Sequence, residues 1–129
     1  MSRGRPPSAG IDLCLPVAQA RGRVMMIEQN GDSPAIFVIA VDRRIIFVAI
    51  HRADPFRLCP AGLEAEYSAM LTILRSLPAS ADIIREAWFY SKAGTLRFFR
   101  VEDSWLLEIG RDGSPLALGD GRAGDEPVR

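Results

Sequence analysis

Apolar residues recur at helical spacing in two segments of the chain. The first segment covers residues 16–30, where Pro16 suits the first position of a helix and Gly31 suits its end. The second covers residues 60–77, which one proline opens and another closes. The pattern therefore predicts two helices over these ranges. The apolar stripes consist of Val17, Ala20, Val24 and Ile27 in the first segment, and of Leu63, Tyr67, Met70 and Leu74 in the second.

Other segments have the composition of strands. Residues 35–41 and 45–50 are almost continuously apolar, which is typical of strands covered on both faces. The three residues between them are too few for a crossover, so the two strands should form an antiparallel hairpin. Three more strands separated by short turns are predicted over residues 82–90, 95–101 and 105–109.

The predicted order of elements is α-β-β-α-β-β-β. This order belongs to the α/β (α+β) class and predicts a single small domain, in which a central mixed sheet is flanked by two helices. The domain should span residues 11–110. Residues 1–10 and 111–129 are rich in glycine, arginine and proline, a composition that predicts disordered ends.

Composition and charge narrow the classes of partner. The chain has 129 residues, and its 16 basic side chains are balanced by 16 acidic ones, so the whole molecule should exert no long-range attraction on nucleic acid. Any nucleic-acid site must come from a local cluster. The apolar windows are too short for a membrane span, and the N-terminal segment lacks the pattern of a signal peptide. We therefore expect a cytoplasmic protein with no membrane partner.

Side chains that bind transition metals are scarce. Cys14 and Cys59 lie far apart and His51 is the single histidine, so neither a structural zinc site nor another cofactor is predicted. Because there is no secretory context, the cysteines should be two buried reduced thiols. A disulfide between them is the alternative.

Residues 33–36 and 44–52 carry a resemblance, together with the order helix, hairpin, helix, strand. They resemble the core of the PD-(D/E)xK nucleases, the superfamily of Holliday-junction resolvases and restriction endonucleases. In that family, an acid on one hairpin strand and an acid-x-lysine triplet on the next hold a divalent cation that activates water. The resemblance places Ala35 at the first acidic position, and Ala49 and His51 in the triplet.

The three remnant positions should lie together. A turn at residues 42–44 would set Ala35 opposite His51 and Phe37 opposite Ala49, with the remnant positions on one face of the sheet. An alanine methyl group offers no ligand to a hard cation, so the resemblance implies a catalytically inactive domain. His51 is then either a remnant that touches a phosphate or a strand-end histidine without a role.

A working metal site would need acids from elsewhere in the chain. Glu28 on the first helix, and Glu64 or Glu66 on the second, could reach the edge of the sheet. The alternative is that these carboxylates lie on solvated faces of the helices.

Residues 88–100 interleave aromatic and basic side chains across a hairpin. Period-two alternation puts Trp88 and Tyr90 on one face, and Arg97 on the same face as Phe99. Arginines that neutralise phosphates beside rings that stack on bases would bind nucleic acid. The candidate nucleic-acid-binding residues are Arg43, Arg44, Arg52, Lys92, Arg97, Arg100, Trp88 and Tyr90.

The alternative for this hairpin is a packed structure. Its rings would form core and its arginines would reach water or pair with Glu86 and Glu102. Three functions therefore remain open. They are an inactive nuclease-like domain that binds DNA or RNA, a non-enzymatic interaction subunit in which this same hairpin forms the oligomer surface and an edge strand carrying its residues pairs in a homodimer, and a metal-dependent nuclease with relocated acids.

Overall fold

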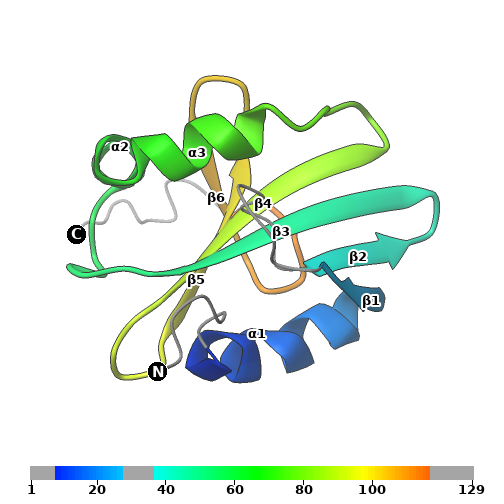
Figure 1. The fold of residues 1–129 in the computed structure, drawn as a ribbon, viewed down its shortest axis with the longest axis horizontal. Helices are drawn as coiled ribbons and strands as arrows, with labels where there is room; N and C mark the ends of the chain where they lie inside the picture. The colour runs from blue at the N-terminus through cyan, green and yellow to red at the C-terminus, as the bar shows by residue number, and fades with distance from the viewer. Residues whose placement is uncertain (1–7, 28–36, 117–129) are drawn as a thin grey trace.

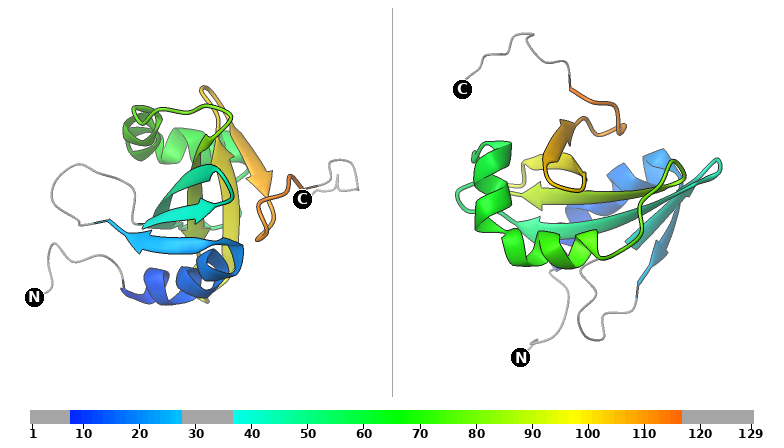
Figure 2. Two further views of the ribbon diagram at one scale, coloured as in Figure 1. Left: turned by 90° about the vertical axis from the view of Figure 1, so that its right-hand side faces the viewer. Right: turned by 90° about the horizontal axis from the view of Figure 1, so that it is seen from above.

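A six-stranded sheet lies between helices in the computed structural model, which describes residues 8–27 and 37–116 (Figure 1). Helix α1 covers one face of the sheet, and α2 with α3 covers the other (Figures 1 and 2). The helices are α1 (Ser8–Arg21), α2 (Pro60–Glu66) and α3 (Ser68–Arg75). The strands are β1 (Arg23–Met26), β2 (Phe37–Val41), β3 (Arg44–Arg52), β4 (Ile83–Tyr90), β5 (Leu96–Val101) and β6 (Leu106–Ile109).

The strands lie in the sheet in the order in which they occur along the chain. Neighbours are antiparallel except β3 and β4, which are parallel and are joined by the crossover through α2 and α3. Each half of the described chain is thus helical at its start and continues as a three-stranded meander. The predicted class, a small single α+β domain with a mixed sheet between helices, is confirmed. The observed order is α-β-β-β-α-α-β-β-β, with one more strand and one more helix than predicted.

Helix α1 begins and ends earlier than its apolar stripe predicts. It contains Pro16 in its interior, and its first turn is formed by residues 8–10, which were predicted to be disordered. The part of the predicted helix that follows Gly22 forms strand β1 instead. Pairing with β2 outweighs the helical spacing there, and Gly22, packed against the Ala40 carbonyl, separates the helix from the strand. Residues 28–31 lie outside the described part of the chain.

The second predicted helix is present but is divided at Tyr67. This residue has φ −114° and ψ 31°, outside the helical region, so α2 ends before it and α3 begins after it. The apolar stripe is otherwise as predicted, because Leu63, Leu71 and Leu74 are buried against the sheet. The hydroxyl of Tyr67 accepts a hydrogen bond from the amide of Asp54, at 3.2 Å, which fixes the bend over the end of β3.

The hairpin of β2 and β3 has a register one residue away from the prediction. Val41 pairs with Arg44, so the loop holds two residues and not three, and Asp42 adopts a left-handed φ of 54°. Phe37 consequently pairs with Val48 and not with Ala49. Phe37 faces α1, whereas Ala49 faces α2 and α3.

Both faces of the sheet are apolar, which explains the continuous apolar runs in the sequence. On the α1 side, the Trp88 ring packs edge-on against Phe37 and Phe98, with ring centroids 5.6 and 5.0 Å apart. On the other side, Phe89 packs against Tyr67 and Phe99 at 5.2 and 5.8 Å. Strands β4, β5 and β6 each begin one residue after their predicted start and end where predicted.

Two adjacent charged residues of β4 are buried between these layers, Arg85 toward α3 and Glu86 toward α1. The Arg85 guanidinium donates from Nη1 to the carbonyl oxygens of Arg75 and Leu77, at 2.9 and 3.1 Å, where α3 ends. Its Nη2 donates to the Val101 carbonyl at 3.1 Å. Arginine near a helix C-terminus satisfies carbonyls that have no partner in the helix, so Arg85 ties α3 to the sheet.

The segment after β6 is ordered further than predicted. Residues 111–116 were expected to be part of a disordered tail, yet Pro115 bridges to Ile109 and the Leu116 amide donates to the Glu108 carbonyl at 3.2 Å. This turn lies along the outer edge of β6. Among the described residues, no helix is long and apolar enough to cross a membrane.

The junction of α1 and β1 should not tolerate a side chain. A methyl group added at Gly22 would lie 2.5 Å from the Ala40 carbonyl oxygen, so Gly22→Ala should lower the free energy of unfolding by about 2 kcal/mol, measured by urea denaturation. Gly110→Ala is the matched control, because its methyl would approach no atom closer than 3.4 Å. Equal losses for the two variants would contradict this account of the junction.

Candidate functional site

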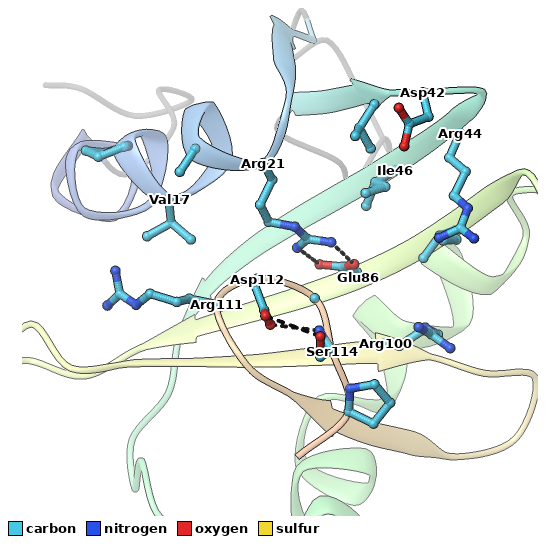
Figure 3. A pocket seen from close by; sticks show the side chains of 16 residues that line it. Val17, Arg21, Asp42, Arg44, Ile46, Glu86, Arg100, Arg111, Asp112 and Ser114 are labelled. Carbon is cyan, nitrogen blue, oxygen red and sulfur yellow. Dashed lines mark hydrogen bonds and ion pairs between the residues drawn. The ribbon is translucent and has the colours of Figure 1, made fainter. Parts of the chain in front are cut away.

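A buried ion pair joins the end of α1 to the middle of the sheet. The Arg21 guanidinium donates to both oxygens of Glu86, from Nη1 to Oε1 at 2.7 Å and from Nη2 to Oε2 at 2.9 Å (Figure 3). Trp88 Nε1 donates to Oε1 as well, at 2.8 Å. The two charged side chains are 10% and 2% exposed, so this bidentate pair lies mostly out of water with the carboxylate well satisfied.

Arg21 is held by its surroundings as well as by its charge. Its guanidinium carbon lies 6.0 Å from the centre of the Trp88 ring. Gly113 approaches it from the turn after β6, with φ 91°, and a side chain there would collide with Nη2. The ion pair therefore connects α1, β4 and the turn that follows β6.

Only one member of this pair, Glu86, could be recognised from the sequence as a buried charge. A glutamate inside the apolar run of β4 must find a partner when it is buried, and Glu86 was considered as a partner for arginines of its own hairpin. The observed partner is Arg21, 65 residues away, and no local pattern could indicate it.

A cavity of about 680 Å³ lies above the ion pair (Figure 3). Helix α1 and the central strands supply an aliphatic wall, and the loops supply polar groups around it. A volume of this size falls within the range of small-molecule sites. The wall includes Val17, Ile46 and Ile84, and the arginines that line the cavity besides Arg21 are Arg44, Arg100 and Arg111.

Two of the remnant nuclease positions, Ala49 and His51, lie on the opposite face of the sheet. Ala49 is buried under α2 and α3. His51 lies at the exposed end of β3, where its ring packs on Tyr67 with centroids 4.9 Å apart and its Nδ1 donates to the Arg52 carbonyl at 2.8 Å. Ala35 lies outside the described residues. The predicted pairing of Phe37 with Ala49, on which the common face depended, is wrong because the turn is one residue shorter.

Neither Glu64 nor Glu66, the two described acids considered for a relocated metal site, belongs to a metal-binding cluster. Glu64 forms a bidentate ion pair with Arg75, with Nη2 and Oε1 2.8 Å apart, and this hydrogen bonding lowers the pKa of the carboxyl group. Glu66 is exposed on α2, and Glu28 lies outside the described residues. Within residues 8–27 and 37–116, no group of three or more metal-binding side chains is placed to hold an ion.

The aromatic and basic hairpin is packed. Its predicted face pattern is confirmed, since Trp88 pairs with Phe98 and Phe89 pairs with Arg97 across β4 and β5. Both Trp88 and Tyr90 are buried, so neither ring is free to stack on a base. The Arg97 guanidinium is bound by both Glu108 oxygens and by the carbonyls of Phe56 and Leu58.

The remaining basic candidates are divided between the two ends of β3. Arg43 and Arg44 lie at the turn before the strand, whereas Arg52 lies at its far end, the same end of the sheet as Lys92 in the β4–β5 turn. A nine-residue strand spans about 30 Å, so these side chains do not form one compact patch. Arg100 lies near Glu102, with Nη1 and Oε2 3.8 Å apart, as the packed alternative predicted.

Both cysteines are free, but they differ in exposure. Cys14 is buried on α1, where desolvation raises the pKa of its thiol to about 12. Cys59 is exposed and caps α2, since its sulfur accepts a hydrogen bond from the Gly62 amide at 3.3 Å. The prediction of two buried thiols is therefore wrong for Cys59, whose place at a helix start exposes it to water.

Comparison with known proteins returns no matching family model, no matching curated protein and no matching solved structure. The resemblance to PD-(D/E)xK nucleases accordingly stays a prediction.

Breaking the buried ion pair should destabilise the fold. Arg21→Met leaves the Glu86 carboxylate buried without its cation, and we expect the free energy of unfolding to fall by about 3 kcal/mol in urea denaturation. Adding Glu86→Gln removes the orphaned charge and should recover part of this loss. Arg111→Met, at an exposed position, is the control and should be nearly neutral. A double variant as unstable as Arg21→Met would contradict the view that the loss of stability comes from the unpaired Glu86 carboxylate.

The two thiols should react at different rates. At pH 8 a chromogenic disulfide reagent should label one thiol per native chain quickly and both in denaturant, because Cys14 is buried and its raised pKa keeps it protonated. Cys59→Ser should abolish the fast phase, whereas Cys14→Ser should retain it. Fast labelling of native Cys59→Ser protein would show that Cys14 is accessible.

Proposed function

We propose that the protein is a non-enzymatic interaction subunit that forms a homodimer through strand β1. The observation that supports this proposal is that β1 lies at the edge of the sheet with exposed apolar side chains. The strand forms one edge of the described sheet, and its Met25 and Met26 side chains are 50% and 53% exposed. An open strand edge with apolar side chains on it readily pairs with another strand.

The two edges of the sheet are not equivalent, and this difference favours a closed dimer. The turn of residues 113–116 lies along β6 and occupies part of its outer edge. Pairing of β1 with β6 of a second copy would be a head-to-tail contact, which repeats into a larger ring or a filament and does not close after two copies. Pairing of β1 with β1 across a two-fold axis closes after two copies.

The sequence of β1 suits antiparallel pairing with itself. With the two-fold axis at Met25, this residue faces its own copy across the interface, and Val24 lies opposite Met26 of the second copy. No arginine then lies directly opposite its own copy. Methionine adapts its shape to irregular apolar surfaces, which suits an interface formed by flexible side chains.

A nucleic-acid-binding function derived from a nuclease remains the second prediction, with less support. Two of its stacking rings are buried and Arg97 is fully engaged with protein partners. Its exposed cations lie at opposite ends of β3. A relocated metal site would need a cluster of acids, and the described residues hold none.

Sedimentation velocity tests the dimer directly. The wild-type chain should sediment as a dimer at high micromolar concentration, and Met25→Lys/Met26→Lys should raise the dissociation constant at least about tenfold, because charge on an edge strand opposes pairing. Trp105→Lys is the matched control, since Trp105 is 52% exposed on the turn between β5 and β6. It should leave the dimer unchanged.

Two results would overturn the proposal. One is a wild-type chain that stays monomeric throughout the concentration range. The other is a dimer that Trp105→Lys disrupts and the methionine variant does not. If the monomeric chain binds branched or duplex DNA with an affinity that falls steeply as salt is raised, nucleic-acid binding replaces dimerisation as the proposed function.

A further inference from the structure

A nitrogen of Arg100 lacks a partner in the wall of the cavity above the Arg21–Glu86 pair. Arg100 Nε is buried, and within the described residues it makes no hydrogen bond. Buried polar atoms in native proteins nearly always have a partner, so an unsatisfied one points to a bound water, ion or ligand. Nη1 of the same guanidinium lies 3.8 Å from the nearest Glu102 oxygen, too far for a hydrogen bond.

A second arginine lines the same region without a partner. Arg44 is exposed at the start of β3, and its side chain makes no hydrogen bond or ion pair within the described part of the chain. Arg44 and Arg100 both line the cavity, and both also line the smaller neighbouring cavity of about 230 Å³. In the view of Figure 3 they lie on one side of the ion pair, and Arg111 lies on the other.

The charges around the cavity leave these arginines available. Four arginines and three carboxylates line it, and Arg21 with Glu86 forms an internal pair. Of the other two acids, Asp112 is held by the amide and hydroxyl of Ser114, at 2.9 and 3.2 Å. Asp42 is exposed at the β2–β3 turn. Three lining arginines therefore stand against two lining aspartates. The Glu102 carboxylate, 3.8 Å from Arg100 Nη1, balances one more of these charges, whereas Arg44 has no ion-pair partner among the described residues.

The opposite part of the cavity is aliphatic. Val17 on α1 and the paired residues Ile46 and Ile84 on β3 and β4 line it. A ligand that satisfies both parts must carry a compact negative group at one end and an apolar body at the other. Inorganic phosphate would satisfy the arginines alone, and an uncharged alcohol would satisfy the wall alone.

We propose that this cavity binds a small organic carboxylate with an aliphatic body. Arg44 and Arg100 hold the carboxylate through the terminal nitrogens of their guanidinium groups, while the aliphatic body lies against Val17, Ile46 and Ile84. A planar guanidinium fork matches a carboxylate in two parallel hydrogen bonds. None of the β1 residues lines the cavity, so this site does not depend on the proposed dimer.

Nuclear magnetic resonance titration of the full chain with octanoate tests the site. Octanoate should shift the Arg100 Nε–H resonance and the backbone signals of residues lining the cavity. Octanol and inorganic phosphate, each of which supplies half of the recognition, should bind at least about tenfold more weakly. Arg44→Met and Arg100→Met should each weaken octanoate binding about tenfold, through loss of charge-assisted hydrogen bonds.

Arg43→Met is the matched control, because Arg43 is an exposed neighbour in the same turn and does not line the cavity. Its affinity for octanoate should stay within about twofold of wild type. The proposal is overturned if octanoate causes no shift at the cavity, if phosphate binds as tightly as octanoate, or if all three variants weaken binding equally. Because Arg44 lies on an exposed turn, its variant keeps the test valid if Arg100→Met fails to fold.

Discussion

The position of both helical layers depends on two adjacent buried charges in strand β4. Side-chain alternation sends Glu86 to the α1 face and Arg85 to the α3 face. An unpaired charge in either place would cost several kcal/mol, so the strand is stable in the sheet only while its partners are present. The partner of Glu86 is the Arg21 guanidinium at the end of α1. Those of Arg85 are the carbonyl oxygens at the end of α3, the Val101 carbonyl and the Asp103 carboxylate. One strand thereby determines where the helices on both faces end.

The same arrangement creates the candidate binding cavity. Because Arg21 neutralises Glu86, the carboxylate does not compete for the arginines at the rim, and Arg44 and Arg100 keep unused hydrogen-bond capacity. The turn carrying Gly113 packs on the Arg21 guanidinium and forms another side of the cavity. The cavity and the stability of the α1 layer consequently share one ion pair, whereas the edge of β1 is independent of it.

Strands β4 to β6 and the stripe of α2 and α3 could be predicted, because burial on one or both faces leaves a direct periodic pattern in the sequence. Strand β1 could not, since Val24 fits a helical stripe as well as a strand and its pairing with Ile39 decides the outcome. The hairpin register could not be predicted either, because it depends on the left-handed backbone of Asp42. Residue type alone rarely indicates that conformation. The Arg21–Glu86 pair joins distant parts of the chain, and no local pattern encodes such a contact.

The parallel pairing of β3 with β4 also has a consequence for biosynthesis. Ile45 pairs with Ile83, so the first meander is complete well before the strand that covers its edge has left the ribosome. Until then β3 presents unpaired backbone groups and an apolar surface to the cell, in the manner of an aggregation-prone nascent chain. The charged turn at Asp42 and Arg43, next to the start of that strand, is then the nearest protection against premature association with other chains.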